Sequence, residues 1–338
     1  RQCAAGGSPG RSRLGTEQAR KINRARSSGE AREARAGGFR GARVKRARSR
    51  AVAMEGVGRL LAKHQRQIIP YGTLALFLFF VYHLVSDQDF SFLLTVGAML
   101  KLFGFGLVLY TVATTGSAEG VSSKTLQAYL IVFCARLASV LSHPGYLPYD
   151  SSGDWFYQLV LVALVAVLGL TLALIHTRLG TSYEASMDSL ATGGSMSVPS
   201  WATVPLLAGP AALLAMIIHP SLNSSFVLDS LWTFALYLEA VAVGPQLWMF
   251  HMRNKRGNDL AKFTAHMVFS LGVGAVLHLL FWLSSHDELN TNALFSNGTV
   301  GYLTVLACIV QVGLMGDFLF LYLKAWQSGQ QMVLPSGG

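Results

Sequence analysis

Residues 231–250 read LWTFALYLEAVAVGPQLWMF, a run long and apolar enough to span a bilayer as one helix. The run nevertheless carries Glu239 near its middle and Gln246 beyond it. Trp232, Glu239 and Gln246 are seven residues apart, so they share one helix face, together with Asp229. A carboxylate at bilayer depth costs about 2.5–3.5 kcal/mol on insertion scales, so Glu239 needs a partner or a water-filled cavity. We therefore expect either a structural ion pair between helices or the wall of a binding cavity.

The chain has the composition of a multi-span helical membrane protein. Apolar residues make up 52% of its 338 residues and charged residues only 13%, against about 25% charged residues in soluble domains. Apolar runs of spanning length recur, whereas the strands of porin-like barrels alternate and reach only about ten residues. The three cysteines, Cys3, Cys134 and Cys308, lack the spacing of a disulfide framework or a metal site. We predict an all-α membrane fold with no metal and no cofactor.

The basic character of the chain is confined to its beginning. Residues 1–53 hold 15 Lys and Arg against three Glu, whereas the remainder holds 12 against 14 Asp and Glu. This tail is rich in Arg, Ala, Gly and Ser and lacks apolar periodicity, so we expect it to be disordered. Its composition fits a transit peptide, a nucleic-acid-binding arm or translated leader sequence, since the first methionine is Met54. The rest of the chain indicates no nucleic-acid partner.

Windows of about 20 residues predict eight spans. The first is the least regular, and Pro205 and Pro210 lie in the fifth, where neighbouring helices satisfy the freed carbonyl groups. The ranges are approximately 68–86, 90–112, 124–142, 154–176, 201–219, 226–251, 262–285 and 299–326.

A basic cluster predicts the orientation. Residues 251–256, HMRNKR, follow the sixth span, and basic loops close to helix ends lie in the cytosol. The loops 144–154, 221–225 and 286–299 then lie on the lumenal side, and none contains Lys or Arg. N-glycosylation sequons occur in these loops at Asn223 and Asn297. With eight spans, both termini are expected in the cytosol.

In this orientation the candidate polar residues lie between mid-depth and the lumenal side, as a cavity open to the lumen requires, and Asp317 in the cytosolic half of the last span is the exception. Each also has a structural alternative. In these alternatives, Arg136 only forms an ion pair with Glu239 or Asp229, and His278 is only a hydrogen-bonded core residue. The tryptophans belong to the interfacial belt. Lys101, at mid-span, is expected to be paired or functional. The candidate cavity residues are Lys101, Arg136, Asp229, Trp232, Glu239, His278 and Trp282.

The sequence gives no indication of an enzyme. It contains no nucleophile elbow, HExxH, P-loop or Gly-rich dinucleotide motif. Two glycine pairs, Gly104 with Gly106 and Gly272 with Gly274, are interpreted as helix-packing positions.

The segment around Pro245 and Gln246 is a PQ-loop motif, and the pattern WTFxxYLExVAxxPQL resembles the fifth helix of the KDEL receptors, the ER-lumen-protein-retaining receptors. The resemblance implies seven helices in two three-helix bundles with a linker helix, as in SWEET proteins. We then expect a tail over 1–53, an extra span within 54–89, the receptor-like domain over 90–326 and a cytosolic tail over 327–338. Further blocks resemble the family in order, at residues 120–136, 204–220, 263–282 and 310–324.

The resemblance also implies a function. Such receptors of ER and Golgi membranes bind C-terminal KDEL or HDEL signals in a lumen-facing cavity and return lumenal proteins to the ER with the coat-vesicle machinery. Lys101 stands, by an approximate alignment, in place of the proton-sensing histidine. Arg136, Asp229, Trp232, Glu239 and Trp282 match cavity positions of the family. Other charged or aromatic positions of the family are occupied here by Leu94, Ser139, Gly274, His278 and Ser285.

Two other functions stay open at this point. A PQ-loop transporter of a small polar solute uses the same fold, but its polar residues would continue to the cytosolic side. The second open function is a divergent trafficking regulator that does not bind the signal. Residues 325–338 contain no lysine, whereas the family resemblance implies a C-terminal lysine motif for retrieval. The expected partners are lumenal proteins with KDEL-like signals, coat-vesicle machinery and the lipid bilayer.

Overall fold

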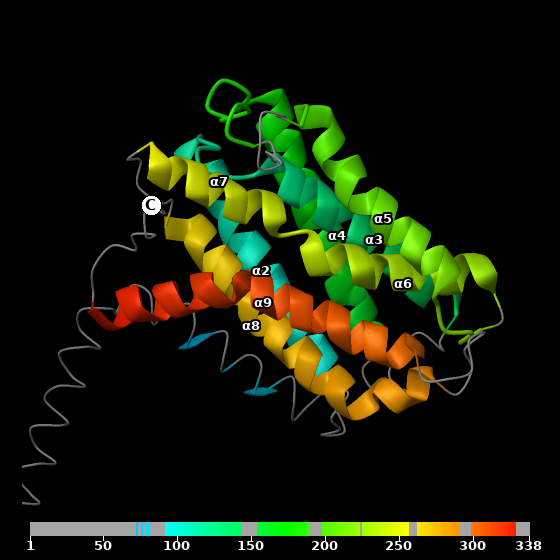
Figure 1. The fold of residues 1–338 in the computed structure, drawn as a ribbon. Coiled ribbons are helices and arrows are strands. Elements are labelled where there is room, and N and C mark those ends of the chain that lie inside the picture. The colour runs from blue at the N-terminus through cyan, green and yellow to red at the C-terminus, as the bar shows by residue number, and fades with distance from the viewer. Residues whose placement is uncertain are drawn as a thin grey trace, which may run out of the picture. The chain divides into compact units, whose positions relative to one another are not determined.

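The computed structural model describes residues 92–143, 154–188, 198–223, 225–256, 262–290 and 299–328, with Gly72, Thr73, Leu76, Phe79 and Phe80. Its elements are all helical (Figure 1). Among the described residues, seven segments are long and apolar enough to cross a membrane. The helices from α2 to α9 belong to one compact unit, residues 73–338.

The observed helices agree with the second to eighth predicted spans to within a few residues. The basic tail, most of the span at 68–86, Asn297 and the last ten residues lie outside the described residues, so the predictions made for them stay predictions. The α-helices are α2 (Phe92–Thr115), α3 (Ser123–Ser142), α4 (Asp154–Thr177), α5 (Thr203–Ile217), α6 (Phe226–Val241), α7 (Gly244–Lys255), α8 (Lys262–Ser285) and α9 (Thr299–Ser328), and the short 3₁₀ helices are η2 (Ser200–Ala202) and η3 (His286–Leu289).

The helices form two triples with the same internal order. Helix α4 packs against both α2 and α3, and α9 packs against both α6 and α8. Helix α5 packs mainly on α6. The triples meet through two pairs of helices, α2 with α8 and α3 with α6. The described helices thus have the two-bundle arrangement with a linker that the family resemblance implied.

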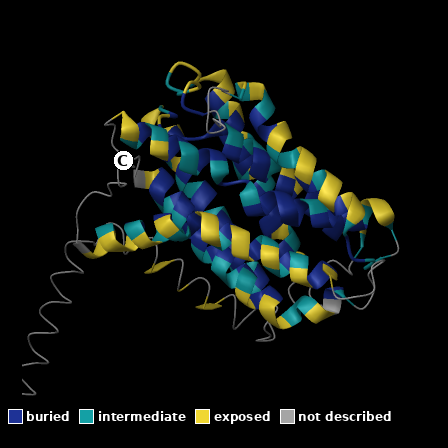
Figure 2. Cartoon of the chain, viewed as in Figure 1, coloured by how far each residue is buried: buried dark blue, intermediate teal, exposed yellow. Residues whose placement is uncertain are grey.

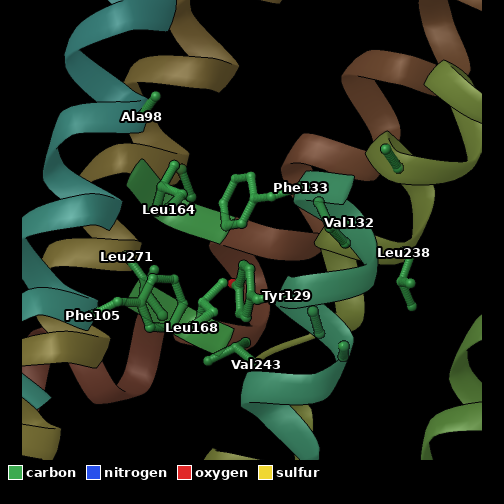
Figure 3. Packing of buried hydrophobic residues seen from close by; sticks show 14 of the residues in the cluster. Ala98, Phe105, Tyr129, Val132, Phe133, Leu164, Leu168, Leu238, Val243 and Leu271 are labelled. Carbon is green, nitrogen blue, oxygen red and sulfur yellow. The ribbon is translucent and has the colours of Figure 1, made fainter. Parts of the chain in front are cut away.

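An aromatic cluster lies in the core where α2, α3 and α4 meet. The ring of Tyr129 stacks on Phe133 and meets Phe105 edge to face, at centroid distances of 6.0 and 5.1 Å. Leu164 and Leu168 of α4 are fully buried beside these rings (Figure 3). The outward faces carry exposed apolar side chains, which suit a lipid environment (Figure 2).

The sixth predicted span is two helices rather than one. Helix α6 ends at Val241 and α7 begins at Gly244. The physical reason is Pro245, which has no backbone N–H and whose ring excludes the carbonyl group one turn earlier. The prediction that Gln246 shares a continuous helix face with Trp232 and Glu239 is therefore wrong, because Gln246 lies on the second helix.

Candidate binding site

An ion cluster, consisting of Lys101, Arg136, Glu239 and His278, joins the four helices through which the triples meet. Arg136 Nη2 lies 2.7 Å from Glu239 Oε2, and the Lys101 ammonium group donates to Glu239 Oε1. Lys101 Nζ also lies 3.4 Å from His278 Nδ1. The side chains of Lys101, Arg136 and Glu239 are 1%, 7% and 2% exposed, so bulk water does not screen these charges. The predicted pairing of Arg136 with Glu239 is confirmed.

Two glycines make room for the cluster between α2 and α8. A Cβ atom on Gly97 would lie 3.3 Å from Cδ2 of His278, and one on Gly274 would lie 3.0 Å from the Gly97 carbonyl oxygen. The same Cβ on Gly274 would lie 3.5 Å from Cε of Lys101. The helix-packing interpretation of Gly274 is confirmed, whereas Gly106 has no atom within 4 Å of a Cβ and does not pack in this way.

The two predicted cavity tryptophans contact each other. Trp232 of α6 and Trp282 of α8 pack edge to face, with centroids 5.8 Å apart and an interplanar angle of 79°. Both are buried within the bundle, so the interfacial-belt alternative is wrong for them. Asp229 is buried at the start of α6, where its carboxylate accepts from the backbone N–H of Asn223 at 3.4 Å. The structure thus places Arg136 on Glu239 and not on Asp229.

Several buried polar atoms near the ion cluster make no hydrogen bond with the described residues. They include His278 Nε2, the Tyr129 hydroxyl group and Gln311 Nε2. Gln311 lies next to the Tyr129 hydroxyl group, which is electrostatically coupled to Glu239 and Arg136. A buried polar atom without a partner costs about 1–3 kcal/mol, and native structures keep few of them. An unpaired atom within a charged cluster, such as His278 Nε2, is a group left to bind a ligand.

Sequence reasoning missed the contribution of α9. Thr304, Cys308 and Gln311 are spaced by four and three residues, so they share one face of α9, and all are buried. Cys308 is electrostatically coupled to Lys101, Arg136 and Glu239. The available indication was this spacing of polar residues in an otherwise apolar span. No group of three potential metal ligands occurs among the residues that the structure describes.

Gln246 of the PQ motif binds the loop before α3, at the end of the bundle that carries the basic loop. Its Nε2 donates to the carbonyl oxygen of Gly120 at 3.0 Å, and its Oε1 accepts from the backbone N–H of Ser122 at 2.9 Å. Its own backbone N–H donates to Thr125 Oγ1 at 2.9 Å. Gln246 therefore fixes the start of α3 to the start of α7.

Three carboxylates complete this second group, of which Asp188 is buried and Glu119 is 60% exposed. We call the group the basic-end network: Glu119, Ser122, Glu184, Asp188, Gln246 and Arg253. Arg253 pairs with Glu119 at 2.9 Å and with Glu184. Asp188 is fully buried and accepts from the hydroxyl groups of Ser122 and Tyr183 and from the backbone N–H of Lys124. Burial and the charge of Asp188 raise the pKa of Tyr183, which keeps this donor protonated.

Comparison with known proteins identifies the family. A family model described as the ER lumen protein retaining receptor matches residues 117–285, from the loop before α3 to the end of α8. The chain belongs to this family. The match includes Arg136, Glu239 and His278, whereas Lys101 and Gln311 lie outside it. The family is one of receptors and not of enzymes, and this member is a multi-pass membrane protein of the ER retrieval pathway.

Curated relatives extend the likeness over most of the chain. The ER lumen protein-retaining receptor of Drosophila melanogaster is 26% identical over 246 residues, covering 71% of this chain and 97% of the relative. The receptor erd-2.1 of Caenorhabditis elegans is 29% identical over 232 residues, or 68% of this chain and 92% of the relative. Receptor B of Arabidopsis thaliana is 28% identical over 246 residues, covering 71% and 97%.

Proposed function

We propose that this chain is a receptor for C-terminal ER-retention signals of the KDEL or HDEL type, which retrieves lumenal ER proteins from the Golgi to the ER. Family membership supports the retrieval role. The signal itself is inferred from the ion cluster, where two buried cations share one carboxylate. A chain end brings a carboxylate, and a charge-assisted hydrogen bond to Arg is the strong way to hold one.

The proposed orientation puts the ion cluster within reach of the lumen. Positively charged loops stay in the cytosol, so the basic-end network, with Arg253 beside Lys255 and Arg256, belongs to the cytosolic end. Helix α3 then runs from the cytosol toward the lumen, and Arg136 lies in its second half. This orientation fits retrieval from Golgi to ER membranes, with lumenal cargo on one side and the coat-vesicle machinery on the other.

Peptide binding to the purified full chain tests the proposal. Peptides of eight residues ending in Lys-Asp-Glu-Leu or His-Asp-Glu-Leu are titrated by calorimetry, with a peptide of scrambled terminal sequence as the control. The titrations are made about one unit below and above the imidazole reference pKa of about 6.5. We expect saturable binding of at least one signal peptide and none of the scrambled one. Equal binding of signal and scrambled peptides, or no binding at either pH, would refute the function.

A further inference from the structure

The segment formed by α6 and α7 is longer than the hydrocarbon core of a bilayer. It covers Phe226–Lys255, which is 30 residues, whereas about 20 residues cross the core. The excess lies at the α7 end, because Phe226 and Val227 at the other end are apolar side chains that are 55% and 69% exposed, as in contact with lipid tails. About 20 residues counted from Phe226 end near Gln246. Most of α7 therefore lies at the depth of the lipid headgroups.

One outward face of α7 combines an aromatic ring with positive charge. Trp248, His251 and Lys255 are spaced by three and four residues and so share this face. The rings of Trp248 and His251 lie 5.7 Å apart, and His251, Lys255 and the following Arg256 are exposed. Tryptophan is typical of the boundary between hydrocarbon and headgroups. The order along α7, from ring to charge, therefore follows the membrane from its core outward.

The two cations at the end of α7 are unpaired. Neither Lys255 nor Arg256 forms an ion pair or a side-chain hydrogen bond within the part of the chain that the structure describes. Arg253, by contrast, is buried and is held by both Glu119 and Glu184. The carboxylates at this end are thus used by the buried arginine. Two adjacent unpaired cations at headgroup depth match a ligand that brings two negative charges.

The acidic residues at this end do not cancel its positive charge. Among the described residues the end has seven Lys and Arg against four acidic residues, a surplus of three. The connection 257–261, outside the described residues, adds one acidic residue, Asp259. The cations are Lys124, Arg178, Arg253, Lys255, Arg256, Lys262 and Lys324, and the acidic residues are Glu119, Glu184, Asp188 and Asp317.

Positive charge on the cytosolic side is common to membrane proteins and does not by itself indicate a ligand. Arg178 and Lys324, exposed cations at the ends of α4 and α9, have no acidic partner among the described residues either. Each is a single charge. The end of α7 differs because it has two adjacent cations, one of them in line with Trp248.

We propose that the end of α7 binds an anionic phospholipid whose headgroup carries a phosphomonoester, such as a phosphorylated inositol, through Lys255 and Arg256 on the phosphate and Trp248 at the glycerol backbone. A phosphomonoester has a charge of about −1.5 to −2 at neutral pH, which matches two cations. Lys255 lies nine residues beyond Gln246, about 14 Å along the helix axis, and the headgroup layer is about 5–8 Å thick. A phosphate that projects beyond this layer meets the two side chains, and the site is separate from the ion cluster.

Short-chain lipids test the proposal on the full chain in detergent. Dioctanoyl phosphatidylinositol 4-phosphate, phosphatidylserine and phosphatidylcholine are titrated, and the affinity is read from the rise in unfolding temperature with lipid concentration. We expect the phosphoinositide to bind at least about fivefold more tightly than phosphatidylserine, because it brings one more charge to the cations, and to bind more weakly as salt rises. Equal affinity for the two anionic lipids, or no phosphoinositide binding, would overturn the proposal.

The headgroup without its acyl chains distinguishes a lipid from a free phosphate. Inositol 1,4-bisphosphate and inorganic phosphate are titrated in the same way, and we expect both to bind more weakly than the lipid, because they do not reach Trp248. If either binds as tightly as the lipid, the site takes a soluble anion and the lipid assignment is wrong.

Two double variants remove equal charge from different places on the same side. Lys255→Gln with Arg256→Gln removes both cations of the site, whereas Arg178→Gln with Lys324→Gln removes two exposed cations from the ends of α4 and α9. We expect the first variant to weaken phosphoinositide binding at least about 20-fold and the second to weaken it by no more than about threefold. Equal losses in both variants would mean that the lipid responds only to the total charge of this end, and the site would be refuted. Peptide binding at the ion cluster is expected to be unchanged in both.

Discussion

The ion cluster is buried and the basic-end network is partly buried, and their charges and hydrogen bonds are arranged in opposite ways. In the cluster, Lys101 and Arg136 share Glu239, and polar atoms nearby lack partners. In the network, Arg253 has two carboxylates, and Asp188 accepts from three donors. A network with its partners in place holds one conformation, whereas a buried cluster with an unpaired atom has a group left for a ligand. We therefore propose that the basic-end network stabilises the fold and that the ion cluster binds the ligand.

The largest expected effect is the loss of peptide binding in Arg136→Ala. The change removes a charge-assisted contact to the ligand and leaves Glu239 with Lys101 as its remaining cation. Truncating one member of a buried charge pair at an interface costs about 2–5 kcal/mol, which corresponds to an affinity loss on the order of 100-fold. Calorimetric titration of the signal peptide measures it.

Arg253→Ala is the matched control, since it removes the same side chain from the basic-end network. We expect it to lower the unfolding temperature in detergent and to leave the affinity within about twofold. If Arg253→Ala abolishes binding and Arg136→Ala does not, the assignment of the two regions is reversed. Equal losses of affinity in both variants would mean that the regions do not differ in role.

The next effect is on stability and comes from Gln246→Leu. The change leaves the Gly120 carbonyl oxygen and the Ser122 N–H without their side-chain partner in a buried place. We expect a loss of about 1–3 kcal/mol in the free energy of unfolding and unchanged peptide affinity at full occupancy. Thermal unfolding followed by circular dichroism measures the loss. The control is Gln127→Leu, which removes one side-chain hydrogen bond to Ser123. An equal loss of stability in the control would mean that Gln246 contributes no more than an ordinary hydrogen-bonding side chain.

Features of the fold and the site could be predicted from the sequence when they depend on residues close together in the chain, and not when they depend on residues far apart. Apolar runs are local, so the bounds of α3, α4 and α8 were predicted within a residue or two. The residues of the site were found because charges at bilayer depth are rare. The break before Gly244 was missed, since membrane helices often tolerate proline. Lys101 and Glu239 are 138 residues apart, and their contact also needs the space that Gly274 leaves by having no side chain. The periodicity of a sequence contains no information on such a long-range contact.

A smaller effect is predicted for Tyr183 at alkaline pH. Because burial and Asp188 raise the pKa of Tyr183, the folded state holds the phenol proton more tightly than the unfolded chain does. The stabilisation is therefore complete below the unfolded value of about 10 and is lost as the pH rises above it. Tyr183→Phe removes the hydrogen bond to Asp188, and we expect it to lower the free energy of unfolding by about 1–2 kcal/mol at neutral pH. We also expect the free energy of unfolding of the variant to fall less steeply at alkaline pH. An alkaline decline as steep in the variant as in the parent would exclude Tyr183 as its source.

The smallest effect concerns His278 and the acid dependence of binding. The Lys101 ammonium group has only hydrogens to offer, so His278 Nδ1 must act as acceptor in their 3.4 Å contact, and the ring is neutral in this arrangement. Protonation removes that acceptor, separates the two groups and adds a positive charge beside Glu239. Both changes favour an incoming carboxylate, while repulsion between the two cations limits the gain. We expect peptide binding to tighten about three- to tenfold toward the acidic end of the titrated pH range, as the imidazole gains its proton.

His278→Phe decides whether this histidine supplies the acid response. The variant keeps a ring of similar size against Gly97 but cannot be protonated, so we expect its affinity to be the same at both ends of the range. His286→Phe is the matched control, because His286 lies beyond the end of α8 and pairs with the exposed Asp287 at 3.3 Å. An acid response that survives in His278→Phe and disappears in His286→Phe would move the sensor from the buried cluster to the surface. The cluster would then bind its carboxylate with the fixed charges of Lys101 and Arg136 alone.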